Sequence, residues 1–219
     1  IKVLAAVKGF PKYTLAGQIF VHQEYVTEGD VDYETGHINY DGNVLIKGRV
    51  KSGFKVTGND ITAIELDGGE IIAEGSVRIN GGINEGKIYS RGNVYAKFIH
   101  KSEVICMGDI VVEKEVVDSE IESSGACLTE TGKLISSRVT AKMGVKARGI
   151  GTEMAEPSTI IVGHDVFIEK ELAGNKEKVE QIQTQITAVG EKKEVLKQEN
   201  LALQKKITDL AHVQDRSQL

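Results

Sequence analysis

The sequence predicts an all-β solenoid, a single-stranded parallel β-helix, followed by a long C-terminal α-helix that forms a coiled coil. Two observations lead to this fold class. A fixed glycine period is typical of a solenoid whose coils bury their apolar faces against one another, and glycines recur here every 16 to 19 residues, at Gly42, Gly58, Gly75, Gly92, Gly108, Gly125, Gly144 and Gly163. From about Leu172 onward the period of apolar residues changes to seven, which is typical of a coiled coil.

Residues 1–34 lack the repeat and are predicted to form a small β element that covers the first coil. Two strand-like runs, at 1–7 and 18–22, flank a turn signal at Gly9 and Pro11. Because an uncovered β-helix end is an open sheet edge that invites aggregation, a covering element is expected there. The chain starts at Ile1 rather than Met, so we expect a fragment or a processed product.

Residues 35–170 are predicted to form the parallel β-helix, with coils of about 17 residues. Aligned on the glycines, segments such as 71–79 and 104–112 place apolar or small residues at every second position, the period of a strand with one buried face. Glycine accepts backbone angles closed to other residues, so we expect it where the strand bends. We expect a right-handed solenoid, because the strict hexapeptide period of left-handed solenoids is missing.

This alignment predicts three inward columns of side chains. They are the residues four before each glycine (Ile38, Phe54, Ile71, Ile88, Val104, Ile121), the small residues two before it (Ala73, Ser90, Cys106, Ser123) and a column from the rest of the repeat (Val50, Ile83, Ile99, Val116, Ile135). The longer intervals after Gly125 predict a loop between Arg138 and Pro157.

Residues 171–219 are predicted to form the coiled-coil helix. Ile at the first seam position with Leu at the second favours a parallel two-stranded coil, and a lone Asn fixes the register. Such a seam needs a partner, so we expect a homo-oligomer through the helix. An antiparallel hairpin folded at Gly190 is the alternative, although the heptad phase runs through that residue without a slip. The first seam position holds Val179, Ile186, Lys193, Asn200 and Ile207, and the second holds Ile182, Val189, Leu196, Leu203 and Leu210.

Composition excludes several classes of protein. A formal net charge of −5 disfavours attraction to nucleic acid phosphates or to an anionic membrane. No apolar run near 18 residues and no charged-then-apolar leader is present, so neither membrane insertion nor a signal peptide is expected. Cys106 and Cys127 occupy inward positions and are interpreted as buried small hydrophobes, for which a reducing compartment such as the cytoplasm is the natural setting.

Residues that carry chemistry are sparse. The histidines, His22, His37, His100, His164 and His212, match no zinc-binding spacing. The Gly-rich stretches lack the context of a phosphate-binding loop. If His100 points outward, it could act as a general base, as a histidine does in β-helical acyltransferases. Carbohydrate-active enzymes need carboxylates clustered on one outer face, and Asp30, Asp32, Glu34 and Asp41 are close in sequence. We interpret both sets as structural, and expect no catalytic residue, cofactor or metal site.

A basic group spans two late coils. A solvated face is the simpler interpretation, and a docking site for an acidic partner is the functional one. Its members are Lys133, Arg138, Lys142, Lys146 and Arg148.

The order of several motifs, at 31–44, 46–50, 81–83, 92–99 and 159–165, resembles the bacterial flagellar assembly protein A family over about residues 1–170. The resemblance implies a cytoplasmic, non-catalytic scaffold domain, the central portion of a longer protein, acting at the flagellated cell pole. It implies protein partners, namely flagellar pole components and, in some bacteria, the dephosphorylated glucose-specific enzyme IIA of the sugar phosphotransferase system. The family defines no catalytic motif that could be carried over.

Two alternatives remain open. Bactofilin cytoskeletal proteins share short β-helical coils with this chain, and they polymerise end to end through bare solenoid tips. The tips of this chain are expected to be covered by the N-terminal strands and by the helix. An enzyme, either carbohydrate-active or an acyltransferase, is the third interpretation.

Overall fold

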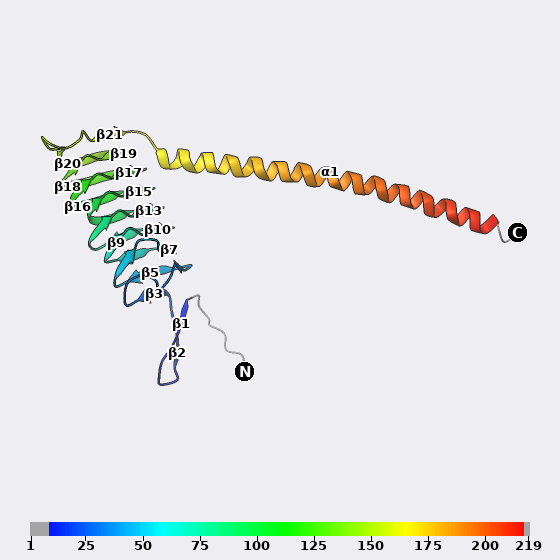
Figure 1. The fold of residues 1–219 in the computed structure, drawn as a ribbon, viewed down its shortest axis with the longest axis horizontal. Helices are drawn as coiled ribbons and strands as arrows, with labels where there is room; N and C mark the ends of the chain where they lie inside the picture. The colour runs from blue at the N-terminus through cyan, green and yellow to red at the C-terminus, as the bar shows by residue number, and fades with distance from the viewer. Residues whose placement is uncertain (1–8, 217–219) are drawn as a thin grey trace. The chain divides into compact units, whose positions relative to one another are not determined.

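A computed structural model describes residues 9–216, and in the helix it describes most of the side chains as far as Gln204 and none beyond. The chain forms two units, one up to Glu169 and one from Lys170 onward. The first is a stack of parallel strands, and the second is one long helix (Figure 1). The predicted parallel β-solenoid with a C-terminal helix is therefore confirmed, whereas its handedness stays a prediction.

One face of the solenoid is a parallel sheet of eight strands within the described part of the chain. From the N-terminal end these strands are β4 (Ile38–Asn39), β7 (Lys55–Gly58), β10 (Glu70–Ala73), β13 (Lys87–Ser90), β15 (Glu103–Cys106), β17 (Glu120–Ser123), β19 (Arg138–Ala141) and β21 (Thr159–Val162).

The second sheet supplies the remaining faces. Its main path consists of β3 (Glu24–Thr27), β5 (Asn43–Ile46), β8 (Ile61–Ala63), β11 (Val77–Ile79), β14 (Val94–His100), β16 (Ile110–Val117), β18 (Ala126–Ile135) and β20 (Gly144–Ile150). The short strands β6 (Arg49–Lys51), β9 (Glu65–Asp67) and β12 (Gly82–Asn84) lie off that path and continue into the second half of β14.

Three inward columns of side chains fill the interior, and strands pair so that each column is in register. Nearly every member is less than 5% exposed. The first column is Ile38, Val56, Ile71, Ile88, Val104, Ile121 and Val139. The second is Val44, Ile61, Val77, Val94, Ile110 and Cys127. The third is Val31, Val50, Leu66, Ile83, Ile99, Val116 and Leu134.

Two predicted column members are wrong. Phe54 is only partly buried, and Val56 takes its place, because Gly58 pairs with Ala73 rather than with the next glycine. Ile135 is half-buried, and Leu134 takes its place, because β18 changes register against β16 between Leu128 and Lys133. In each case the sequence alignment of that coil was anchored on its glycine, and a local irregularity in strand pairing shifts the inward position by one or two residues.

The glycine column also has a different cause from the one predicted. Gly75, Gly92 and Gly108 stack through backbone N–H···O bonds of 2.9 and 3.1 Å, and none of them has a positive φ. A Cβ at Gly92 would meet Ser76 Oγ at 2.6 Å, so close approach requires glycine here. Asn59 and Met143 occupy this column in other coils, which places Gly58 and Gly144 outside it.

Buried hydroxyl groups form a ladder along a second corner. Ser119 Oγ accepts the N–H of Ser102 at 3.2 Å and donates to the carbonyl of Val117 at 2.7 Å. Ser102 and Ser137 repeat the same pair of bonds in the coils on either side. The preceding residues have φ near +48°, a conformation that turns the chain at the corner: Lys101, Asp118 and Ser136.

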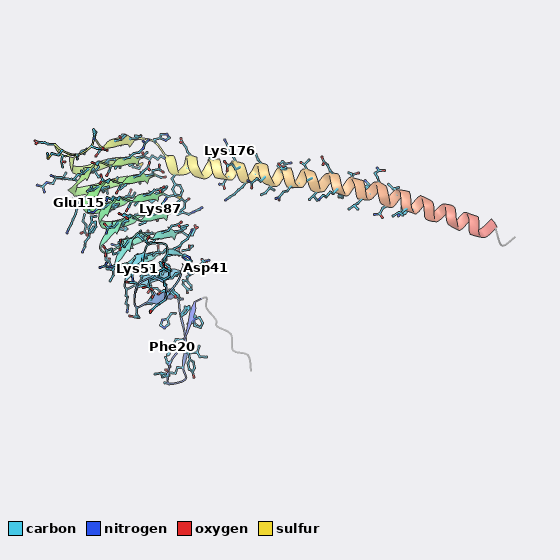
Figure 2. The ribbon with its side chains drawn as sticks, in the orientation of Figure 1. Phe20, Asp41, Lys51, Lys87, Glu115 and Lys176 are labelled. Carbon is cyan, nitrogen blue, oxygen red and sulfur yellow. The ribbon has the colours of Figure 1, made fainter. Side chains whose placement is uncertain are left out.

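The N-terminal part differs from the prediction. Strand β3 already pairs in parallel register with β5, so the first rung begins at Glu24 rather than near residue 35. Before it, β1 (Phe10–Tyr13) and β2 (Ile19–His22) form an antiparallel hairpin. Phe10 contacts the first rung through Tyr25, with ring centroids 5.0 Å apart. Figure 2 shows Phe20 on this hairpin, where its side chain is 48% exposed.

The C-terminal helix α1 (Val166–Arg216) is continuous through Gly190. The alternative of an antiparallel hairpin is therefore excluded, and the helix begins five residues before the predicted boundary. No part of it, within the residues described, combines the length and the apolarity that a membrane crossing requires.

Candidate partner-binding surfaces

The predicted basic group is divided between two sheets. Arg138 lies on β19, and Lys142 is the first residue after that strand. Lys133 lies on β18, whereas Lys146 and Arg148 lie on the neighbouring strand β20 of the other sheet. The structure thus places Lys133, Lys146 and Arg148 on neighbouring strands of one sheet and the other two on the opposite sheet, although Lys133 stands in register with Gly149 and Lys146 with Leu128.

Carboxylates engage three of these five cations. Arg138 faces Glu120 at 3.8 Å, Lys142 binds Asp165 at 3.1 Å, and Lys146 binds Glu130 at 2.7 Å. Lys133 and Arg148 are exposed and have no ion pair among the residues that the structure describes. Whether the group binds a partner stays a prediction.

The C-terminal tip of the solenoid is an open end. Strands β20 and β21 are the last strands of their sheets in the described chain. These two strands carry exposed apolar side chains, with exposed fractions of 59% for Ile150 and 60% for Val162. The partner of Ile150 in the rung below, Leu134, is fully buried. Whether the helix covers this tip, as expected from the sequence, stays a prediction.

A cluster of contacts fixes the first turn of α1 to the eight-stranded sheet. Asp165 Oδ1 accepts bonds from the Ser124 hydroxyl at 2.6 Å and from the Ile168 N–H at 3.3 Å, as an N-cap does. Partial burial favours a higher pKa for Asp165, but Ser124, Lys142 and the Ile168 amide together hold that pKa below its usual value. Phe167 is 2% exposed and stacks on Tyr89 at a centroid distance of 5.1 Å.

The predicted coiled-coil seam is exposed on the single chain. Lys193 and Asn200 are exposed too, and the side chains of Ile207 and Leu210 lie outside the described residues. The exposed fractions of the apolar members run from 55% to 66%, for Val179, Ile182, Ile186, Val189, Leu196 and Leu203. This stripe has no partner within the described chain.

The carboxylates considered for carbohydrate chemistry have structural partners. Lys51 Nζ lies 3.0 Å from Asp30 and 2.9 Å from Asp32. The Arg49 N–H and Lys51 lower the pKa of Asp30, and Lys51 and the Glu34 N–H lower that of Asp32. A general acid must keep its proton near neutral pH, and these groups cannot do so.

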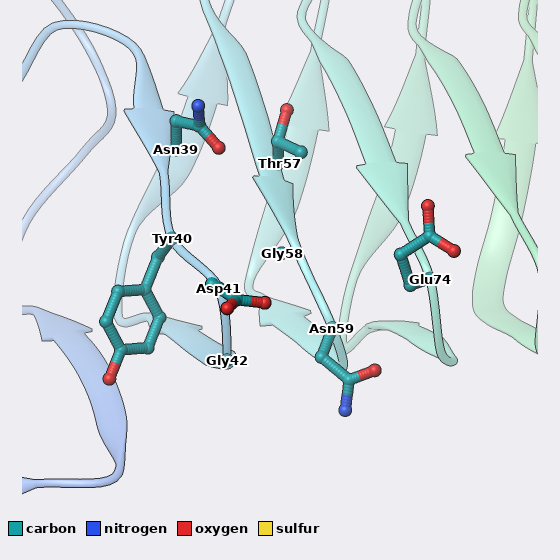
Figure 3. Close-up of a pocket in the computed structure, with 8 residues that line it drawn as sticks. All are labelled: Asn39, Tyr40, Asp41, Gly42, Thr57, Gly58, Asn59 and Glu74. Atoms are coloured by element: carbon teal, nitrogen blue, oxygen red, sulfur yellow. The ribbon is translucent and has the colours of Figure 1, made fainter. Parts of the chain in front are cut away.

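Asp41 lines a shallow depression of about 330 Å³ with Asn39, Asn59 and Glu74 (Figure 3). Figure 3 shows Tyr40 turned toward the N-terminal strands, where its hydroxyl lies 3.4 Å from the carbonyl of Gln23. The depression is open, and neither a histidine nor a cysteine lines it. Its lining residues are mostly polar.

The histidines are dispersed. His100 Nε2 lies 3.0 Å from Glu115, and its ring contacts Phe98. His37 Nδ1 accepts the Lys55 N–H at 3.1 Å, and His164 lies beside Glu169. His22 is exposed, and the side chain of His212 lies outside the described residues. Within residues 9–216 no three metal-ligating side chains gather into a group.

The two cysteines are interior. Burial raises the pKa of Cys106 to about 12 and that of Cys127 to about 11. Because the thiolate is the reactive form, neither thiol is suited to nucleophilic chemistry.

Comparison with known proteins gives one match. The family model described as the flagellar assembly protein A beta solenoid domain matches residues 23–218. No curated protein matches the chain, and neither does any solved structure. The matched region begins one residue before β3, so it takes in every rung of the solenoid and the described helix.

Proposed function

Because the chain belongs to the flagellar assembly protein A family, we propose that it is a non-catalytic scaffold of bacterial flagellar assembly, acting in the cytoplasm by binding other proteins. The match over the whole solenoid and the helix is the observation that carries this proposal. Family membership supplies the flagellar role, and the scaffold role rests on how the side chains of the solenoid are used.

Residues that could carry out chemistry are already engaged in holding the coils together. The thiols are buried, Asp30 and Asp32 share Lys51, and the serine hydroxyls of the corner ladder bond to backbone. Outward side chains, such as Lys87 and Glu115 on different sides of the solenoid (Figure 2), lie outside the packed interior, and their contacts are with other outer side chains. A rigid stack with variable outer faces is suited to binding proteins.

The helix supplies a way to pair two such solenoids. Six apolar seam side chains are more than half exposed on the single chain, which is an unfavourable arrangement for a helix in water. We propose that a second copy covers them in a parallel coiled coil, with Asn200 against its counterpart.

The flagellar role can be tested by deleting the gene in a flagellated bacterium that carries it. We expect flagella to be lost or misplaced in electron micrographs, and the wild-type gene to restore them. A His100→Ala variant should restore them equally well, because His100 has no catalytic role in this proposal. Flagella of normal number and position in the deletion strain would contradict the flagellar role, and failure of a folded His100→Ala protein would favour an enzyme.

The proposed partners are flagellar pole components and the dephosphorylated glucose-specific enzyme IIA, which the family resemblance implies. Calorimetric titration with purified enzyme IIA is the direct test for the latter. Binding of the dephosphorylated form alone is expected, and equal binding of both forms, or of neither, would remove this partner from the proposal.

A bactofilin-like polymer is the second candidate. The open edge of β20 and the exposed Ile150 favour it, because end-to-end polymers form through bare solenoid tips. Concentration-dependent filaments of the purified chain would support it.

A further inference from the structure

Cations on the outer faces of the solenoid often bind carboxylates of a neighbouring rung. Lys55 binds Glu70 at 3.1 Å and Lys87 binds Glu103 at 3.0 Å, each in the rung that follows. Arg91 and Arg138 bind carboxylates of the rung that precedes them. An inner rung therefore has a neighbour on either side that can supply a carboxylate.

At β20 only the rung below is available. Lys146 binds Glu130 of that rung, and in the described chain no strand follows β20 in its sheet to supply a further carboxylate. Arg148 is exposed and has no ion pair among the described residues. The outer side of the tip therefore has an excess of positive charge next to an open strand edge.

The inner side of the same strand is also incomplete. Val145 continues the column of Ile110 and Cys127, which are fully buried, yet Val145 itself is only partly buried. Ala147 stands in register with Thr129, which is likewise fully buried. One more extended strand on β20 would cover both side chains and would pair the free backbone groups of this edge.

We propose that the edge of β20 binds an extended acidic segment of a partner protein, which adds to the solenoid as a further rung. Its apolar side chains cover Val145 and Ala147, and its carboxylates pair with Lys146 and Arg148. The inference rests on the proposed scaffold function, for which it names a surface and the chemistry of a partner.

A second copy of this chain fits the edge less well. If two β20 strands paired with each other, Lys146 and Arg148 of one copy would face the same cations of the other, and like charges across a strand pair are destabilising. Charged residues on an edge strand are a common means of preventing this association.

The probe for the test is a synthetic, fluorescently labelled, blocked heptapeptide of sequence Thr-Val-Glu-Val-Glu-Val-Thr, with a control peptide that has lysine in place of glutamate. Binding to the full chain is followed by fluorescence anisotropy. We expect the glutamate peptide to bind, the lysine peptide not to bind, and Arg148→Glu to weaken binding by about tenfold or more. The matched control is Lys114→Glu, the same charge change at an exposed mid-solenoid position on β16, which should leave binding unchanged.

Hydrogen exchange locates the bound peptide, because a new rung would slow exchange at residues 144–150 and leave residues 94–100 unchanged. The proposal is overturned if the glutamate peptide does not bind, if Arg148→Glu binds it as well as wild type, or if the tip instead self-associates. Those outcomes concern only this edge, since the flagella of the deletion strain decide the scaffold function separately.

Discussion

Single residues at the corners of the solenoid determine how closely its rungs can stack. Gly108 lies where the backbone of Gly92 and the side chain of Asn93 leave no room for a Cβ. Asn93 Oδ1 accepts the N–H of Asp109 at 2.8 Å, and Asp109 Oδ1 accepts the N–H of Ala126 at 2.8 Å. The glycine therefore makes space for a ladder of side-chain-to-backbone bonds between rungs.

We expect Gly108→Ala to lower the free energy of unfolding by about 1–3 kcal/mol, because the new methyl group must displace backbone or break the ladder. Urea denaturation followed by circular dichroism measures this. Gly29→Ala is the matched control, since a Cβ there meets nothing within 4 Å, and it should change stability little. Equal effects at the two sites would contradict the packing explanation.

The interior cysteines lead to a second prediction at this scale. Native protein should not react with a disulfide reagent such as dithionitrobenzoate near about pH 8, because burial raises the pKa of Cys106 to about 12 and that of Cys127 to about 11. Both thiols should react once the protein is unfolded in denaturant. Rapid reaction of one thiol in the native state would show that its position in the column is wrong.

These raised pKa values also give a direction for the pH dependence of stability. The unfolded chain loses its thiol protons near the ordinary value of 9.0, whereas the folded chain keeps them to higher pH. The stability contributed by the neutral buried thiols is therefore complete below pH 9.0. It is lost as the pH rises from there through the folded values.

At the scale of elements, the first turn of α1 depends on Asp165. This residue caps the helix through the Ile168 N–H and also binds Ser124 and Lys142, which directly follow strands β17 and β19. Its lowered pKa means that the anion stabilises the contact above the ordinary value of 3.8, and that this contribution is lost as the pH falls through the lower folded value.

We expect Asp165→Ala to destabilise the start of the helix by about 1 kcal/mol, the usual cost of losing an N-cap. Faster amide exchange at residues 166–169, measured by nuclear magnetic resonance, would show it. Asp165→Asn caps nearly as well and should exchange almost as slowly, but the Ile168 amide shift should no longer titrate in acid. Unchanged exchange in Asp165→Ala would mean that Phe167 alone holds the turn.

An element could be predicted from the sequence where its pattern of residues recurs in every coil. Alternating apolar positions recur in every coil, so the strands, the first column from Ile71 to Ile121 and the helix could be predicted. Phe54 and Ile135 were wrong because Gly58 and the register change in β18 are single irregularities. The serine ladder was missed, since Ser102 and Ser119 read as polar turn residues until the corner geometry is known.

The candidate sites were less predictable for a related reason. Lys133, Arg138, Lys142, Lys146 and Arg148 are close in sequence, but one coil places its residues on different faces, so proximity in sequence does not give a patch. The open edge at β20 has no sequence motif of its own. It exists because, in the described chain, no further strand pairs with β20 on that side.

For the whole molecule, we propose that the solenoid is a rigid scaffold and that the helix joins two copies of it. The exposed seam leaves this second part dependent on a partner that the single chain does not contain. Pairing through the helix also distinguishes the proposed scaffold from a cytoskeletal polymer, whose copies would associate through the tips of their solenoids.

Sedimentation equilibrium of the purified chain is the most direct test. We expect a discrete species of twice the chain mass over the accessible concentration range. Leu196→Asp at the seam should convert it to a monomer, and Glu191→Gln, at an exposed position off the seam, should leave it a dimer. A mass that grows with concentration into filaments, or a dimer that survives Leu196→Asp, would contradict the account.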